Sequence, residues 1–229
     1  LPMTTSATIR HDTQTEAPQT DLRPVVRDGV SHATMLGFGE NYLGAFAIAL
    51  QGTPLQIGTL AALPPLLGAL FQTASVRVIE LLHYRRRIIV IGAFLQALLW
   101  IPIGLLPFTV VSSPSAVDIL ITLVSLYFIC AGFIAPIWSS LVGDLVPSNA
   151  RGRFFGRRNT FIGLATFLSM CAGGVILELS RGANLLMFGF QAIFLLAFAA
   201  RLVSTYWLTR YEDPTYHVLD ESRFSFFDF

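Results

Sequence analysis

Glu40, in the stretch LGFGENYLG, is an acidic residue inside a long apolar segment. A carboxyl group in apolar surroundings can take up and release a proton or contact a polar solute, and Asn41 beside it can add hydrogen bonds. The same carboxyl group can instead make a structural hydrogen bond to a neighbouring helix. The sequence leaves both roles open, and Glu40 and Asn41 are the candidates for a substrate or proton pathway.

A second group of charged side chains lies in GDLVPSNARGRFFGRRN, from Gly143 to Asn159. Proline ends a helix because it lacks an N–H and clashes with the preceding turn, so Pro147 predicts a helix end followed by a loop. The four arginines can hold that loop at anionic lipid headgroups, at about 1 kcal/mol each near the surface. Asp144 can neutralise one of these arginines or lie near the N-terminus of another helix. The arginines are Arg151, Arg153, Arg157 and Arg158.

Other kinds of chemistry lack the residues that they need. The four histidines are scattered along the chain and form no set of metal ligands. The glycines of GFGENYLG follow no strand, which argues against a dinucleotide loop, and no Gly-x-Ser-x-Gly stretch supplies a serine nucleophile. A net charge of +1 implies no general attraction to nucleic acid. We therefore expect no enzyme, no cofactor, no metal site and no nucleic-acid partner.

Composition indicates which elements must position these side chains. The 229 residues are 54% hydrophobic and 13% charged, and a soluble domain usually has about 25% charged residues. Six apolar segments approach or exceed the length of about 20 residues that crosses a bilayer. They are 33–50, 54–78, 88–110, 117–142, 161–176 (extending to 179 or back to 159) and 185–208. The sequence predicts an all-α membrane protein with six transmembrane helices.

The position of Glu40 in the first segment makes its carboxyl group notable. A helix that starts near Ser31 places Glu40 about 14 Å along its axis, near the middle of the membrane, where an acidic group costs about 2–3 kcal/mol. Small and polar residues share its face, which suits close helix packing or a cavity wall. That face holds Ala33, Gly37, Gly44, Ala47 and Gln51, whereas Leu36, Leu43, Phe46 and Leu50 are expected to face lipid or a different helix.

The arginines are distributed unequally between the two sides of these segments. Fourteen of the fifteen fall before the first segment, between the second and third, between the fourth and fifth, or at the end of the sixth, and Arg181 alone falls on the other side. Arginine-rich loops stay in the cytoplasm. We therefore expect both termini in the cytoplasm of a bacterial cell and the chain in its inner membrane. The expected regions are a mobile tail over 1–30, the helical domain over 31–208, and a tail or linker over 209–229.

The stretch GDLVPSNARGRFFGRRN resembles the loop between the fourth and fifth helices of the major facilitator superfamily. The likeness rests on Asp144, Pro147, Arg151, Gly152 and Gly156. The earlier stretch ELLHYRRR, from Glu80 to Arg87, is similar to a weakened copy of the acidic-Gly-basic loop motif of that family. Glu80 stands where the aspartate of the motif would be, and His83 replaces its glycine. The resemblance covers roughly residue 27 to the end.

The resemblance implies a transporter half of six helices with both ends inside the cell. It also implies that the motif residues of the two loops help to hold one gate state during alternating access, whereas topology and lipid anchoring alone would also explain the arginines. These residues are Glu80, Arg85, Arg86, Asp144, Arg151, Gly152 and Arg153.

Transporters of this kind resemble two six-helix halves around a central site, and this chain supplies one half. Three interpretations are open. The chain is a piece cut at the linker between halves, a half-transporter that pairs with itself or a sister chain, or a non-transporting accessory or assembly subunit of a larger membrane complex. Besides membrane lipids, the expected partners are accordingly a second half, a second copy, or other membrane subunits.

Overall fold

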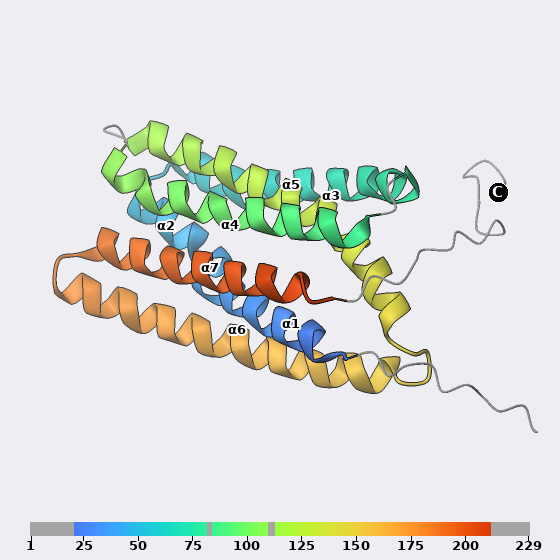
Figure 1. Ribbon diagram of the computed structural model, residues 1–229. Helices are drawn as coiled ribbons and strands as arrows, with labels where there is room; N and C mark the ends of the chain where they lie inside the picture. Colours follow the sequence, from blue (N-terminus) through green and yellow to red (C-terminus); the bar gives the residue numbers. More distant parts are fainter. Residues whose placement is uncertain (1–20, 82–83, 110–112, 212–229) are drawn as a thin grey trace, which may run out of the picture.

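The computed structural model describes residues 21–81, 84–109 and 113–211, and the described chain is helical without strands. Figure 1 shows the helices packed lengthwise as one elongated bundle. In chain order the elements are α1 (Arg23–Phe38), a 3-10 turn (Glu40–Tyr42), α2 (Leu43–Ala49), α3 (Pro54–Leu81), α4 (Arg85–Thr109), α5 (Ser113–Leu145), α6 (Arg151–Gly182) and α7 (Leu186–Leu208).

Five of the described helices, α3 to α7, are long and apolar enough to cross a membrane. The first predicted segment differs, because a 3-10 turn after Gly39 separates α1 from α2 and leaves no continuous helix of sufficient length. A Cβ atom at Gly39 would collide with the indole ring of Trp100. Glycine therefore allows the Trp100 ring to lie against the backbone at the interruption, and it also weakens the helix there.

Two predicted boundaries were wrong. The tail was expected to reach residue 30, but α1 begins at Arg23, where Pro24 suits the first helical positions, and Val25 and Gly29 are buried against the bundle. The loop that follows Pro147 was expected to run to Asn159, but α6 begins at Arg151. Only the residues between Leu145 and Arg151 connect the two helices. The arginine-rich stretch that follows contains no proline, so it can continue as a helix.

The bundle is built around α5, α7 and α1. Helix α5 packs against α3 and α4, α7 against α4 and α1, and α1 also against α6. Where α3 meets α5, a Cβ atom at Gly132 would collide with the carbonyl oxygen of Gly68, so the two backbones touch. Small residues permit such close approach of membrane helices. By contrast, α6 turns large side chains such as Leu164, Phe167 and Leu168 outward, as a lipid-facing helix does.

The interior has two apolar cores. One is aromatic, with Phe46, Trp100, Tyr127, Phe190 and Phe194 packed together, and it lies around the interruption of the first segment. Phe46 was expected to face lipid or a different helix, and it contacts Phe190 and Phe194 of α7. The other core is aliphatic and includes Val25, Ile89, Ile137, Leu141 and Leu208.

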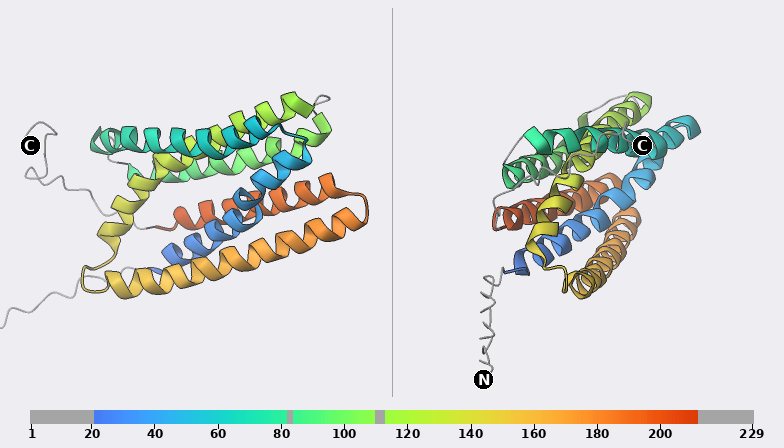
Figure 2. Two further views of the ribbon diagram at one scale, coloured as in Figure 1. Left: turned by 180° about the vertical axis from the view of Figure 1, so that it is seen from behind. Right: turned by 90° about the vertical axis from the view of Figure 1, so that its right-hand side faces the viewer.

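One end of the bundle collects most of the described arginines. The starts of α1, α4 and α6 and the ends of α3, α5 and α7 all lie at this end, as the views in Figure 1 and Figure 2 agree. Arg23, Arg27, Arg85, Arg86, Arg87, Arg151, Arg153 and Arg157 belong to those helix ends. We call it the arginine-rich end. Arg181, in the last turn of α6, lies at the opposite end.

Candidate functional site

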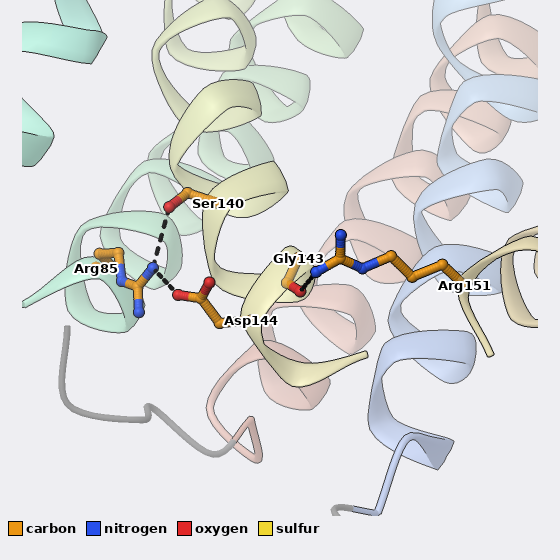
Figure 3. Close-up of polar contacts among 5 residues, drawn as sticks. All are labelled: Arg85, Ser140, Gly143, Asp144 and Arg151. Atoms are coloured by element: carbon orange, nitrogen blue, oxygen red, sulfur yellow. Dashed lines mark hydrogen bonds and ion pairs between the residues drawn. The ribbon is translucent and has the colours of Figure 1, made fainter. Parts of the chain in front are cut away.

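At the arginine-rich end, the first residue of α4 forms an ion pair with the last turn of α5. The Nη1 atom of Arg85 lies 2.7 Å from Oδ2 of Asp144, and it also donates a hydrogen bond of 3.0 Å to Ser140 Oγ (Figure 3). Asp144 was expected to pair with an arginine of its own loop or to lie near another helix N-terminus. Its partner is Arg85, the residue with which α4 begins.

Arg151 has a different task, because its side chain turns back onto the end of α5. Its Nη2 donates to the carbonyl oxygen of Gly143 at 2.7 Å (Figure 3). Its Nε donates to the carbonyl oxygen of Val146 at 3.1 Å. The last carbonyl groups of a helix have no partner within the helix, and a basic side chain can satisfy them. Arg151 therefore caps α5.

The structure joins only part of the predicted loop motif. Arg86 donates to the backbone oxygen of Tyr211 at 2.9 Å, beyond the end of α7. Gly152 and Arg153 are exposed on the first turn of α6. Glu80 belongs to α3, and its side chain lies outside the described part of the structure, as does His83. Among the described members of the motif, Arg85 and Asp144 thus form an ion pair, Arg151 caps a helix, and Arg86 forms a hydrogen bond with the backbone after α7.

Glu40 lies half-buried at the interruption between α1 and α2. The hydroxyl group of Tyr127, on α5, donates to Glu40 Oε2 at 3.0 Å and also lies 3.2 Å from the sulfur of Met35. The Glu40 carboxyl group therefore forms a hydrogen bond with the neighbouring helix α5. The side chain of Asn41 is exposed. The predicted small-residue face is not continuous, because the interruption divides it. Ala33, Gly37 and Ala47 are buried, whereas Gly44 and Gln51 are exposed.

Sequence reasoning missed a buried polar cluster on α1 and α7. Arg201 was expected among the cytoplasmic arginines. In the structure Arg201 belongs to α7, and its side chain is buried inside the bundle. Its Nη1 donates to Ser204 Oγ at 2.8 Å and lies 2.9 Å from His32 Nδ1, and Ser204 Oγ donates to Asp28 Oδ1 at 2.6 Å. The available signal was an arginine inside an apolar run with a serine one turn later.

Tyr211 closes this cluster from beyond α7. Its hydroxyl group donates to Asp28 Oδ2 at 2.9 Å and accepts a hydrogen bond of 3.3 Å from the indole of Trp138. Burial and the neighbouring Asp28 carboxyl group hold the pKa of Tyr211 well above its ordinary value. Tyr211 therefore keeps its proton and remains the donor to Asp28.

The cluster borders a cavity of about 390 Å³ between α1, α4, α5, α6 and α7. Its polar wall consists of Asp28, His32, Gln96, Ser139, Arg158 and Arg201, and the rest of the wall is apolar apart from the indole of Trp138. A cavity of this size and lining is typical of a small-molecule site.

The described helices form a bundle with an ion pair at one end and a polar-lined cavity, and five of them are long and apolar enough to cross a membrane. The family model for the Major Facilitator Superfamily matches residues 32–226, so the chain belongs to the Major Facilitator Superfamily. Members of this family are transporters and not enzymes. No curated protein and no solved structure matches the chain.

Proposed function

We propose that this chain is one six-helix half of a secondary transporter, which moves a small solute by alternating access together with a second half. The interrupted segment from α1 to α2 serves as the sixth membrane crossing beside α3 to α7. The second half is supplied by a longer polypeptide, by a sister chain or by a second copy of this chain. Transporters with paired halves place the solute site where the halves meet, near the middle of the membrane.

The ion pair between Arg85 and Asp144 is the observation that carries this proposal. Arg85 is fully buried, whereas the Asp144 side chain is half exposed. Asp144 can therefore hold Arg85 inside this half and at the same time accept a contact from the facing half. A contact made in one arrangement of the halves and lost in the other favours one gate state.

The arginine distribution supports an orientation for this half. We assign the arginine-rich end to the cytoplasm, which places both termini inside the cell and the chain in a bacterial inner membrane. Exposed arginines such as Arg87 and Arg153 then lie at the level of anionic lipid headgroups. In this orientation the Arg85–Asp144 pair belongs to the cytoplasmic gate.

A second candidate function is favoured by the weakened loop motif, in which His83 stands in place of a glycine. In that function the chain is a non-transporting accessory or assembly subunit of a larger membrane complex. The two candidates differ in what accompanies the chain and in whether the assembly transports.

Purification from native membranes in mild detergent separates them, with the mass of the assembly measured by light scattering and its chains identified by mass spectrometry. We expect a mass above the 25.1 kDa of this chain, composed of two six-helix halves that catalyse uptake in liposomes. Fixed stoichiometry with unrelated membrane subunits and no uptake would establish the accessory role. A monomer of this chain that catalyses uptake alone would overturn the paired-half proposal.

A further inference from the structure

We propose that the cavity beside the buried cluster binds the carboxylate of a small organic acid, held by Arg201 and Arg158. The cavity then is the part of the solute site that this half contributes, so the inference rests on the transporter function proposed above and adds its substrate class.

His32 contributes no positive charge to the cavity wall. Its Nδ1 lies 2.9 Å from Nη1 of Arg201. A guanidinium group has donors only, so the imidazole nitrogen must accept this hydrogen bond. An imidazole that accepts through Nδ1 carries its proton on Nε2 and is neutral.

Asp28 is the acidic residue of the cavity wall. Both of its oxygens already accept hydrogen bonds from hydroxyl groups, those of Ser204 and Tyr211. Within the described residues, no ion pair joins Asp28 directly to Arg201 or Arg158. Two guanidinium groups thus face one carboxyl group that is engaged elsewhere, and the cavity keeps a surplus of positive charge.

Arg201 is only 4% exposed. Its two side-chain hydrogen bonds both leave from Nη1, and its Nε is buried without a partner in the described part of the chain. A buried cation is normally paired, because removing it from water without compensation is costly. A ligand carboxylate in the cavity that Arg201 lines would supply the missing counter-charge.

Arg158 is held in place by contacts with two other helices. Its guanidinium group lies 4.6 Å from the ring centre of Trp138 on α5, and its Nε donates to the backbone oxygen of Val25 on α1 at 3.3 Å. Gly29 leaves the space that this position needs, because a Cβ atom there would lie 2.7 Å from Arg158 Nη2. The guanidinium group is therefore positioned before any ligand binds, which lowers the cost of binding.

The lining indicates an organic acid and not an inorganic anion. Around the two arginines the wall is mainly aliphatic, with Ile89, Ile134, Ile162 and Leu208 among its members. An apolar body is favoured by this surface, while the carboxylate can form paired hydrogen bonds with a guanidinium group. The volume of about 390 Å³ admits an acid of the size of benzoate.

The test is equilibrium binding of radiolabelled benzoate to the full chain in detergent, with unlabelled benzoate and the neutral amide benzamide as competitors. We expect saturable binding that benzoate displaces and benzamide does not. Arg158→Gln and Arg201→Gln are each expected to weaken binding at least tenfold. Gly29→Ala, which keeps both charges and displaces the Arg158 guanidinium group, is expected to weaken binding as well.

The matched control is Arg181→Gln, which removes an exposed arginine of α6 at the opposite end and is expected to leave the affinity unchanged. Because Arg201→Gln can unfold the bundle, Arg158→Gln and Gly29→Ala carry the test when their melting curves match the parent. The inference is overturned by absent saturable binding, by equal displacement with benzamide, or by unchanged affinity in folded Arg158→Gln. Transport by the paired halves without carboxylate binding would refute only the substrate class, whereas binding without transport would refute the proposed function.

Discussion

Nη1 of Arg85 lies 2.7 Å from Oδ2 of Asp144, and the two side chains are 1% and 50% exposed. The Asp144 carboxylate compensates part of the cost of burying the Arg85 guanidinium group, and that cost remains when the carboxylate is removed. Ser140 shares the same Arg85 nitrogen but brings no charge. The pair is therefore a contact whose loss acts mainly through Arg85.

Asp144→Ala should destabilise the protein, because it removes the 2.7 Å ion pair to the buried Arg85 guanidinium group. We expect a loss of about 2 kcal/mol, less than for a fully buried pair since Asp144 is half exposed. Thermal unfolding in detergent measures it, with Arg181→Gln as the control that removes an exposed charge. A double variant with Arg85→Met should recover part of the loss. Equal melting temperatures for Asp144→Ala and the parent would show that the pair contributes no stability.

Gly132→Ala should destabilise the contact between α3 and α5, because its methyl group meets the backbone oxygen of Gly68. We expect a cost of about 1–3 kcal/mol, typical of overpacking. Gly163→Ala is the matched control, since no atom lies within 4 Å of a Cβ there. Alanine stabilises a helix relative to glycine by up to about 1 kcal/mol, so this control should melt at the same or a higher temperature. A Gly132→Ala protein that also melts higher would contradict the close approach of the backbones.

Single cysteines should report the orientation of the bundle in a background without Cys130 and Cys171. Arg87→Cys, at the arginine-rich end, should react with a membrane-impermeant maleimide only from the cytoplasmic side. Asn184→Cys, in the exposed connection between α6 and α7, should react only from the opposite side. Labelling of Arg87→Cys in intact cells would reverse the proposed orientation.

Glu40→Gln should leave the fold intact, because the amide oxygen can still accept the hydrogen bond from Tyr127. If Glu40 carries the coupling proton, this variant should abolish pH-driven solute accumulation in liposomes that contain both halves. Tyr127→Phe is the complementary control, since it removes the hydrogen bond and keeps the carboxyl group. Unaltered accumulation with Glu40→Gln would limit Glu40 to its packing role.

The membership of the chain in the Major Facilitator Superfamily was predicted from the Asp144 loop, and the family match confirms it. The positions of α3 to α7 were also predictable, because each helix has a long apolar run between polar ends. Helix ends were harder to predict. The first turns of α6 are rich in arginine and resemble a loop in composition, yet they continue the helix up to the short connection after Leu145.

The polar contacts within the bundle could not be predicted from neighbouring residues in the sequence. The partner of Asp144 is Arg85, which lies 59 positions earlier in the chain. Arg201 and Asp28 were assigned to cytoplasmic regions because charge in a membrane protein usually marks a loop. Their hydrogen bonds through Ser204 keep them inside, and this depends on α1 and α7 packing side by side.

The interruption at Gly39 has a consequence for how the protein is made. Where a helix is broken, backbone groups lose their internal partners, and lipid supplies none. Here the break is covered by the Trp100 ring and by Tyr127, which belong to α4 and α5. These helices are synthesised after the segment that they cover. The segment from α1 to α2 can therefore reach its final conformation only once α4 and α5 are in place, so assembly of this bundle is cooperative and does not proceed strictly from the N-terminus.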